Sequence, residues 1–312
     1  MEELQIGGLL AGCQETEPLL APAPNRPQFS SVAGQGFKGA IVFHSTRAGS
    51  FDVFVMNADL SRVTQLTNTP DNDIDPIWSP NGQQIAFNRF NYAFSTLEID
   101  VMNADGSGVT HLADNGFATA WSPDGKRIAF ARDPGFGDEI FVMNADGTGV
   151  TQLTNNFFVR DFPTAWSPDG KRILFQSDTV GNNELYVMNA NGTGVKRLTN
   201  NPASDEGDHA GWSPNGQQII FSSDRDGGAL HIFVMNADGT GVTQLTSGPF
   251  TDDDPVWSPD GKQIAFQSTR DGDEEMFVMN ADGSRVTQLT FNEGFFDAVP
   301  GWRAWPLPDS KE

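Results

Sequence analysis

Residues 119–130 read TAWSPDGKRIAF, and residues 141–154 read FVMNADGTGVTQLT. Both phrases recur along the chain. The phrase VMNA followed by Asp or Asn occurs six times, and its methionines lie 41 to 47 residues apart, at Met56, Met102, Met143, Met188, Met235 and Met279. The phrase WSP followed by Asp or Asn and then Gly occurs five times, and a degenerate copy survives at Trp302. The chain is therefore built from internal repeats of about 45 residues.

A period near 45 residues is typical of four-stranded propeller blades, whereas helical repeats of that length need a 3.6-residue apolar periodicity that is absent here. In one unit we expect strands at 164–166, 172–175, 185–188 and 195–198. The connecting Ser-Pro-Asp-Gly and Asn-Ala-Asn-Gly sequences favour tight turns, because Pro presets φ and Gly accepts a positive φ. The sequence predicts an all-β, six-bladed β-propeller of four-stranded antiparallel blades.

The order of the phrases also predicts how the ring closes. Residues 41–43 match a second strand, and residues 301–302 match a first strand. We therefore expect the C-terminal strand to join the N-terminal blade, which leaves no unpaired edge in the ring. The predicted organisation is a truncated signal and Pro-rich tether over 1–38, the propeller over 39–306 and a short tail over 307–312.

These repeats resemble those of the TolB-like β-propeller family, whose copies combine a WSPDGK phrase with a following VMNADG phrase. The resemblance extends from Gly39 to Trp305 and is far more specific for fold than for function. It implies a free-standing, non-catalytic binding or scaffolding propeller of the bacterial cell envelope, periplasmic or extracytoplasmic. In that family the propeller of TolB docks an outer-membrane lipoprotein, so a protein or peptide partner is expected here.

The single cysteine, Cys13, excludes an intrachain disulfide and a zinc site built from cysteines. Leu10-Ala11-Gly12-Cys13 resembles a bacterial lipobox, which predicts lipidation of Cys13 and an anchor as the one attachment to a membrane. The alternative is a chance match, because residues 1–6 contain no Lys or Arg of the kind a signal peptide carries.

The charge balance restricts the class of partner. The chain carries 19 Lys and Arg against 41 Asp and Glu, a formal net charge of −22. Such a field repels phosphate backbones, so nucleic acid is excluded as a partner, and it favours a cationic protein or peptide. We expect the propeller to act as a monomer.

The loops that differ between repeats fall on one rim of the predicted propeller, opposite the invariant turns. This rim is acidic and aromatic, and function usually resides in such variable loops on a rigid scaffold. The predicted partner-binding residues are Asp75, Asp254, Phe94, Phe136, Phe158, Phe250 and Phe296.

Four aspartates recur five residues before a repeat tryptophan: Asp73, Asp161, Asp252 and Asp297. Because first strands line the axial channel, these carboxylates are candidate oxygen ligands for a cation such as Ca²⁺. The alternative is that they cap turns by bonding nearby backbone amides.

Catalysis has weaker support. The four histidines show no metal-ligand spacing, and His209, beside Asp208, is the one candidate general base near the channel. The alternative function is a carbohydrate-active propeller of lyase or glycosidase type, with or without a required cation. That alternative predicts a deep axial cleft where His209 and two acids converge, whereas a binding propeller predicts shallow pockets and carboxylates far apart.

Overall fold

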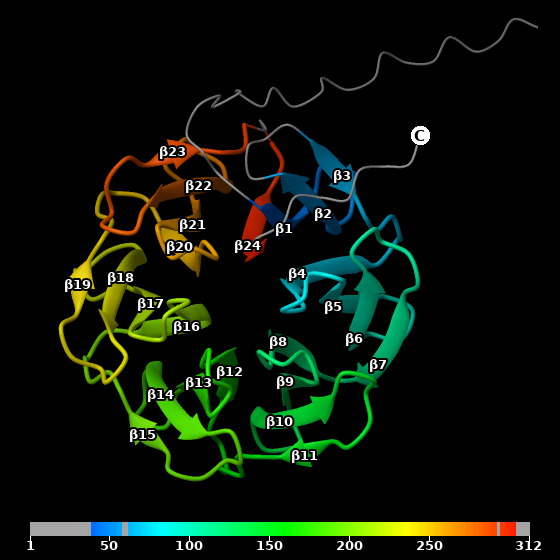
Figure 1. The fold of residues 1–312 in the computed structure, drawn as a ribbon, viewed down its shortest axis with the longest axis horizontal. Helices are drawn as coiled ribbons and strands as arrows, with labels where there is room; N and C mark the ends of the chain where they lie inside the picture. Colours follow the sequence, from blue (N-terminus) through cyan, green and yellow to red (C-terminus); the bar gives the residue numbers. More distant parts are fainter. Residues whose placement is uncertain (1–38, 58–61, 292–293, 304–312) are drawn as a thin grey trace, which may run out of the picture.

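The computed structural model describes residues 39–57, 62–291 and 294–303, and it describes the backbone alone at 118, 119, 207, 208 and 299. These residues form 24 strands in six four-stranded sheets around a central axis (Figure 1). No helix in the described ranges is long and apolar enough to cross a membrane. Residues 1–38 and 307–312 lie outside the described residues, so the tether, Cys13 and the tail stay predictions.

Each blade runs from an inner strand at the axis to an outer strand at the circumference. Blade 1 contains β4 (Asn72–Trp78), β5 (Gln84–Asn91), β6 (Thr96–Asn103) and β7 (Thr110–Asp114). Blade 2 contains β8 (Phe117–Trp121), β9 (Arg127–Arg132), β10 (Glu139–Asn144) and β11 (Thr151–Gln152). Blade 3 contains β12 (Asp161–Trp166), β13 (Arg172–Ser177), β14 (Glu184–Asn189) and β15 (Lys196–Arg197).

The remaining blades follow the same order. Blade 4 contains β16 (Asp205–Trp212), β17 (Gln218–Ser223), β18 (His231–Asn236) and β19 (Thr243–Gln244). Blade 5 contains β20 (Asp252–Trp257), β21 (Gln263–Ser268), β22 (Glu275–Asn280) and β23 (Thr287–Gln288). Blade 6 combines β24 (Asp297–Arg303) with β1 (Ala40–Ser45), β2 (Asp52–Asn57) and β3 (Val63–Gln65).

Blade 6 confirms the predicted closure of the ring. Strand β24 pairs antiparallel with β1, with Trp302 opposite Ile41 and Gly301 opposite Val42. The two ends of the described chain therefore share one sheet, as Figure 1 shows where the red and blue strands lie together. The six-bladed all-β architecture predicted from the repeats is confirmed.

The hydrophobic core lies between blades. Between blades 2 and 3, Trp166, Ile173 and Met188 of blade 3 pack against Ala129 and Val142 of blade 2. Phe175 stacks on Tyr186 within blade 3 with ring centroids 5.4 Å apart, and four other blades repeat this pair with two Phe rings. Because each blade buries both faces against its neighbours, the inner strands are held firmly around the axis.

Candidate binding site at the loop face and axial channel

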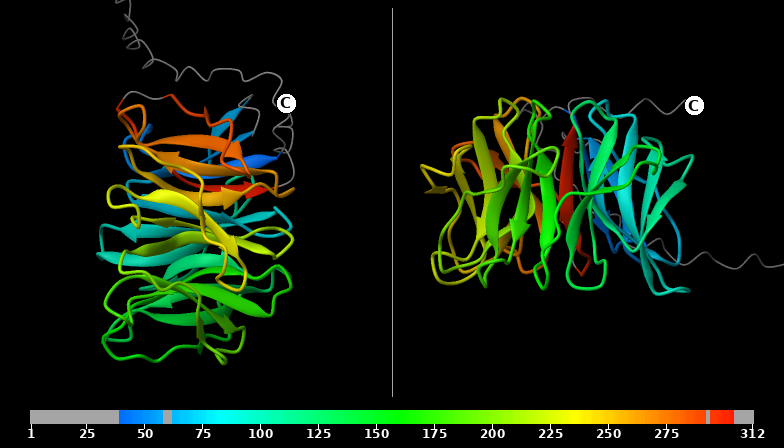
Figure 2. Two further views of the ribbon diagram at one scale, coloured as in Figure 1. Left: turned by 90° about the vertical axis from the view of Figure 1, so that its left-hand side faces the viewer. Right: turned by 90° about the horizontal axis from the view of Figure 1, so that it is seen from below.

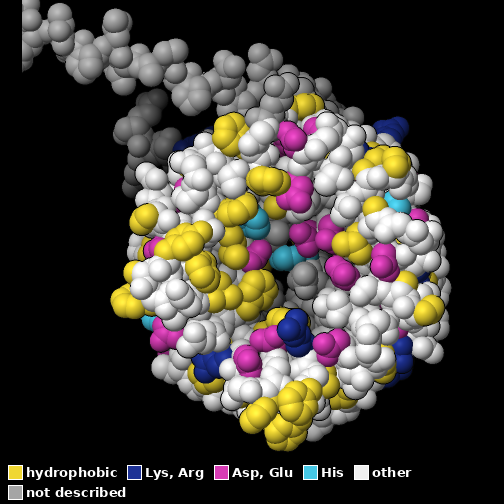
Figure 3. Space-filling view, turned by 180° about the vertical axis from the view of Figure 1, so that it is seen from behind, with side chains coloured by type: hydrophobic (Ala, Val, Ile, Leu, Met, Phe, Trp, Pro, Cys, Tyr) yellow, Lys and Arg dark blue, Asp and Glu magenta, His cyan; other side chains and the backbone are white. Residues whose placement is uncertain are grey.

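The two rims of the ring have different chemistry. The turn face contains the Ser-Pro-x-Gly and Asn-Ala-x-Gly turns, and the loop face contains the loops between second and third strands together with the links between blades. Figure 2 shows the two rims at opposite ends of the strands. On the loop face, acidic side chains surround a central opening and apolar side chains gather further out (Figure 3).

Two histidine–aspartate pairs lie at the axial channel, and each joins two successive blades. His44 of β1 accepts a hydrogen bond at Nδ1 from the backbone N–H of Asp75 in β4, at 3.1 Å. Nδ1 of His209 in β16 lies 2.9 Å from Oδ1 of Asp254 in β20. Asp75 and Asp254 occupy the same place, three residues before a repeat tryptophan, where the inner strand shifts register.

Both aspartates have a strained backbone. Each has φ of 51°, a left-handed conformation that non-glycine residues seldom adopt, and each precedes a proline. A conformation of this kind costs on the order of 1–3 kcal/mol and persists where the surroundings fix it. The same conformation recurs at this position in blades 1 and 5, where the inner strand shifts register.

The imidazoles of His44 and His209 differ in which ring nitrogen carries the proton. Since Nδ1 of His44 accepts a hydrogen bond, its proton lies on Nε2 and the ring is neutral. Burial lowers the pKa of His44, and the charges of Asp75 and Asp254 offset that effect in part. His209 faces a carboxylate oxygen, which accepts, so its Nδ1 carries a proton. The channel therefore presents one neutral acceptor-type histidine and one histidine paired with an acid.

Further carboxylates crowd the same region. Burial raises the pKa of Asp253 to about 7, and the neighbouring charges of Asp254 and Glu206 add to the effect. The backbone N–H of Asp254 donates to Oδ1 of Asp253 at 2.8 Å. Burial also raises the pKa of Glu274, again with a contribution from Asp254. These acids give the channel mouth between blades 4 and 5 an excess of negative charge near His209.

The pKa of Asp253 makes the stability of the fold depend on pH. Its pKa in the folded chain exceeds the ordinary value of 3.8, so folding favours the protonated form. This contribution is complete below about pH 4 and is lost as the pH rises through 7. We expect Asp253→Asn, which keeps the Oδ1 acceptor, to raise the free energy of unfolding at pH 8 by on the order of 2 kcal/mol relative to the wild type.

Urea denaturation of both proteins at pH 4, 6 and 8 checks this expectation. The difference between them should shrink steadily toward pH 4, because the wild-type carboxyl is then protonated as well. A difference that is the same at all three pH values would contradict the raised pKa of Asp253.

A hollow of about 350 Å³ lies in the channel toward the turn face. Its lining includes His209, Arg303 and tryptophans of four blades, Trp78, Trp212, Trp257 and Trp302. Among the described residues the lining contains no carboxylate, although His209 and two acids, Asp253 and Asp254, lie near one another. The structure thus brings His209 near two acids, Asp253 and Asp254, but places both acids outside the hollow.

Exposed aromatic rings form the second feature of the loop face. Phe158, Phe157 and Phe136 of blade 2 and the following link have exposed fractions of 84%, 67% and 56%. The ring of Phe136 lies 5.5 Å from that of Phe157 and 6.3 Å from that of Phe158. The N–H of Phe158 donates to the carbonyl of Phe136, which ties the two loops together. We call these three rings the phenylalanine cluster.

The other predicted partner-binding residues are spread over the face. Phe94 and Phe296 are exposed, as expected. Phe250 lies half-buried beneath the guanidinium of Arg270, 4.6 Å from the ring centroid, and so differs from the exposed ring that was expected. Asp75 and Asp254 lie at the channel rather than at the outer rim. The side chain of Asp208 lies outside the described residues.

The four aspartates predicted as calcium ligands are fully buried, and the structure gives each its own local partner. Asp73 binds Arg89, Asp252 binds Arg270, Asp297 binds Arg47, and Asp161 accepts a hydrogen bond from Asn156. These carboxylates do not converge into a group of three within 4.8 Å in the described chain. Calcium binding by them stays a prediction, and it would require Asp73, Asp252 and Asp297 to leave their arginines.

Sequence reasoning missed His44 and Asp253. His44 lies in β1 and its partner in the following blade, and the inner-strand position of Asp75 is occupied by a different residue type in most repeats. The available signal was the three-residue run Asp252-Asp253-Asp254, since adjacent carboxylates in a buried strand repel one another and raise a pKa.

Comparison with known proteins fits this geometry. A family model described as the TolB beta propeller domain matches residues 74–210 and 209–304. The chain belongs to this TolB β-propeller family. A search of curated proteins found no match.

Solved structures share the fold of this family member at low sequence identity. TolB from Acinetobacter baumannii is 21% identical, with a TM-score of 0.74 over 85% of this chain and 67% of that one. A putative TolB from Agrobacterium tumefaciens is 23% identical, with a TM-score of 0.66 over 86% and 91% of the two chains. An oligogalacturonate lyase in complex with manganese is 14% identical, with a TM-score of 0.56 over 82% and 74%. The fold is therefore common to proteins of different activity.

Proposed function

We propose that this TolB-family propeller is a non-catalytic binding module of the bacterial cell envelope that engages a cationic protein or peptide through its loop face. The phenylalanine cluster carries the proposal. Three adjacent rings that are more than half exposed form an apolar patch, and soluble proteins usually bury such a patch against a partner. Phenylalanine is among the aromatic residues that are enriched in protein–protein interfaces.

The negative charge of the chain supports a positively charged partner. With a net charge of −22 and acidic side chains around the central opening (Figure 3), the loop face attracts a cationic surface and repels an acidic one. The rigid blades hold the loops in place, so little ordering entropy opposes binding. Family membership supports an extracytoplasmic location, and the lipobox-like Cys13 supports a lipid anchor.

A carbohydrate-active function receives less support. It requires two acids in a cleft that holds the sugar, and none of the described residues that line the channel hollow is a carboxylate. His44 also has no nitrogen available as a base, because Nδ1 accepts the hydrogen bond from the Asp75 N–H and Nε2 carries the proton. We therefore propose binding, with a monomeric propeller as the unit.

The test compares two triple variants in binding to envelope proteins. Phe136→Ser, Phe157→Ser and Phe158→Ser remove the phenylalanine cluster, whereas Val150→Ser, Val195→Ser and Val242→Ser remove exposed apolar groups that precede outer strands. After chemical cross-linking identifies the partner, its affinity is measured by calorimetry with each purified variant. The cluster variant should bind at least about 30-fold more weakly, as expected for loss of a dominant contact.

The valine variant should keep the wild-type affinity, and salt should weaken binding because the attraction is between opposite charges. Equal affinities for the two triple variants, with melting temperatures unchanged, would show that the phenylalanine cluster does not form the interface. Turnover of an oligosaccharide by the purified chain would instead favour the carbohydrate-active alternative.

A further inference from the structure

Blade 1 differs from the other five blades at one cross-strand pair. In those blades an aromatic residue of the third strand faces a polar side chain of the outer strand, in the pairs Phe54–Gln65, Phe141–Gln152, Tyr186–Arg197, Phe233–Gln244 and Phe277–Gln288. In blade 1 the corresponding pair is Asp100 and His111. A buried carboxylate and an imidazole replace a core aromatic ring and an amide, which costs hydrophobic burial and calls for a compensating role.

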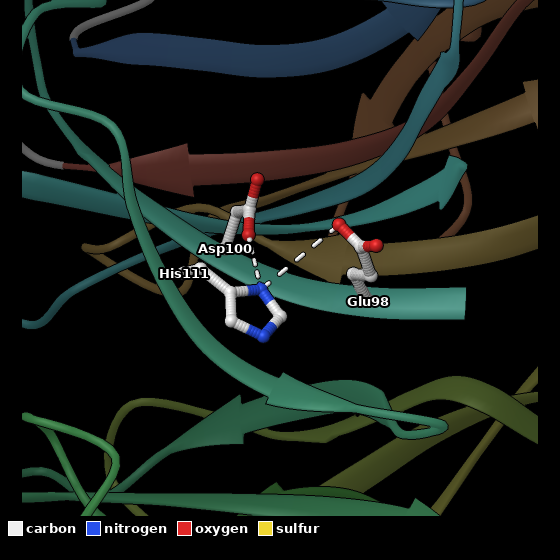
Figure 4. Close-up of side chains that lie close together, drawn as sticks. All are labelled: Glu98, Asp100 and His111. Carbon is white, nitrogen blue, oxygen red and sulfur yellow. Dashed lines mark hydrogen bonds and ion pairs between the residues drawn. The ribbon is translucent and has the colours of Figure 1, made fainter. Parts of the chain in front are cut away.

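Together with Glu98, these residues form a group of ligand-type atoms (Figure 4). Nδ1 of His111 lies 3.2 Å from Oδ1 of Asp100 and 4.0 Å from Oε2 of Glu98. All three atoms lie within 4.8 Å of one another. Two ligands that each bind a tetrahedral ion at 2.0–2.2 Å are about 3.4 Å apart. The atoms are thus close to the spacing that a bound ion requires.

The remaining polar atoms of the three side chains are held by neighbours. Arg89 donates to Oδ2 of Asp100 at 2.8 Å. Asn91 and Thr96 donate to Oε1 of Glu98 at 3.0 and 3.2 Å. Each carboxylate is therefore fixed through one oxygen, and its second oxygen lies toward His111.

The second nitrogen of His111 has a partner of the type found in metal sites. Nε2 lies 3.2 Å from Oδ1 of Asp114. A histidine that binds a metal almost always donates its other N–H to a carboxylate or carbonyl, which fixes the tautomer and the ring. Here that arrangement would leave Nδ1 free of its proton and available to a cation.

Charge favours a cation as well. Four carboxylates, those of Asp73, Glu98, Asp100 and Asp114, surround Arg89 and His111. The guanidinium already binds both Asp73 and Asp100, at 2.7 and 2.8 Å. The cluster keeps an excess of negative charge that a divalent ion would offset.

We propose that Glu98, Asp100 and His111 bind Zn²⁺ at the loop-face edge of blade 1. One imidazole nitrogen and two carboxylate oxygens suit Zn²⁺, whereas Ca²⁺ requires six to eight oxygen ligands. A hollow of about 560 Å³, lined in part by Phe94 and Asn115, borders Glu98 and His111, and water from it would complete the coordination. This site is separate from the axial channel and from the phenylalanine cluster.

Calorimetric titration of the full, tag-free chain with ZnCl₂ after removal of metals tests the proposal. The wild type should bind one equivalent saturably. His111→Gln installs the residue that four other blades carry in this place, and Glu98→Gln removes one carboxylate. Both variants should lose this binding, and Asp114→Asn should weaken it about 10- to 100-fold. Asp146→Asn removes the same charge as Glu98→Gln at an exposed turn and should bind like the wild type.

A second readout separates metal binding from folding. Co²⁺ in a site of low coordination number absorbs visible light, and this absorption should appear with the wild type and be absent with His111→Gln. Unchanged melting temperatures in a chelator would show that both variants are folded. Unsaturable uptake by the wild type, or equal affinity of wild type and His111→Gln, would overturn the proposal and leave His111 as an ion-pair partner of Asp100 and Asp114.

Discussion

Replacement of Trp166 by alanine is expected to lower the free energy of unfolding by about 3–5 kcal/mol. The ring is 6% exposed and packs between blades 2 and 3, against Ile173 of its own blade and Val142 of the preceding one. Its removal leaves a cavity that neighbouring strands, fixed by their ladders, cannot close. The guanidinium of Arg127 also lies 4.4 Å from the ring centroid and would lose this contact.

Urea denaturation followed by circular dichroism measures this loss. Phe94→Ala removes another large aromatic side chain, but one that is exposed, so it should change the free energy of unfolding by less than about 0.5 kcal/mol. If Trp166→Ala cost as little as the Phe94 variant, the repeat tryptophan would not be the contact that joins blades.

The fold could be predicted from the repeat because residues that recur in every copy pack in the same way in every blade. A tryptophan or an Ile-Ala-Phe run that recurs every 45 residues must meet the same environment in every copy, and in a closed ring that environment is the next blade. The phase of the first and last copies then determined which strands pair at the closure, and β24 does pair with β1. The inner strands proved longer than expected, as in β12 (Asp161–Trp166), because their first residues lack the apolar pattern.

The aspartates of the inner strands show why the site was harder to predict. Asp252 and its repeats were interpreted from their own periodicity, but three of the four pair with arginines that have no fixed place. Arg89, for example, lies within the second strand β5, whereas Arg270 follows the second strand β21. Where blade 2 has Gly116 instead of the aspartate, Nε of Arg132 has no hydrogen-bond partner in the described chain. The aspartate and the arginine thus form one ion pair, and a search for acidic residues alone finds only one of its two members.

The two histidine–aspartate pairs at the axial channel could not be predicted from the sequence, for a different reason. His44 and Asp75 are 31 residues apart and His209 and Asp254 are 45 apart, and the residue types at these positions change from blade to blade. A contact of this kind depends on which neighbouring blades carry complementary side chains, and no periodicity encodes it. The cluster of Glu98, Asp100 and His111 could have been found, because Asp100 interrupts a position that is aromatic in the other repeats.

Replacement of Asp252 by alanine is expected to lower the free energy of unfolding by about 3–5 kcal/mol. The carboxylate is fully buried, and its Oδ1 lies 2.6 Å from Nη2 of Arg270. Arg270 is itself mostly buried, against the rings of Phe250 and Phe277. Without Asp252 the guanidinium keeps its positive charge in a place that water hardly reaches, because an arginine does not lose its proton in proteins.

A double variant separates the loss of an ion pair from damage to the core. Asp252→Val combined with Arg270→Met removes both charges and keeps apolar volume, so it should be more stable than Asp252→Ala by at least about 1 kcal/mol. Lys262→Ala breaks an exposed ion pair with Asp260 and should cost less than about 1 kcal/mol. If the double variant were no more stable than Asp252→Ala, the cost would lie in lost packing. A positive result would mean that Asp252 serves mainly to neutralise the buried Arg270, a role that Asp73 and Asp297 are placed to serve for Arg89 and Arg47. The loop face, rather than a ring of carboxylates, would then be the surface through which the propeller works.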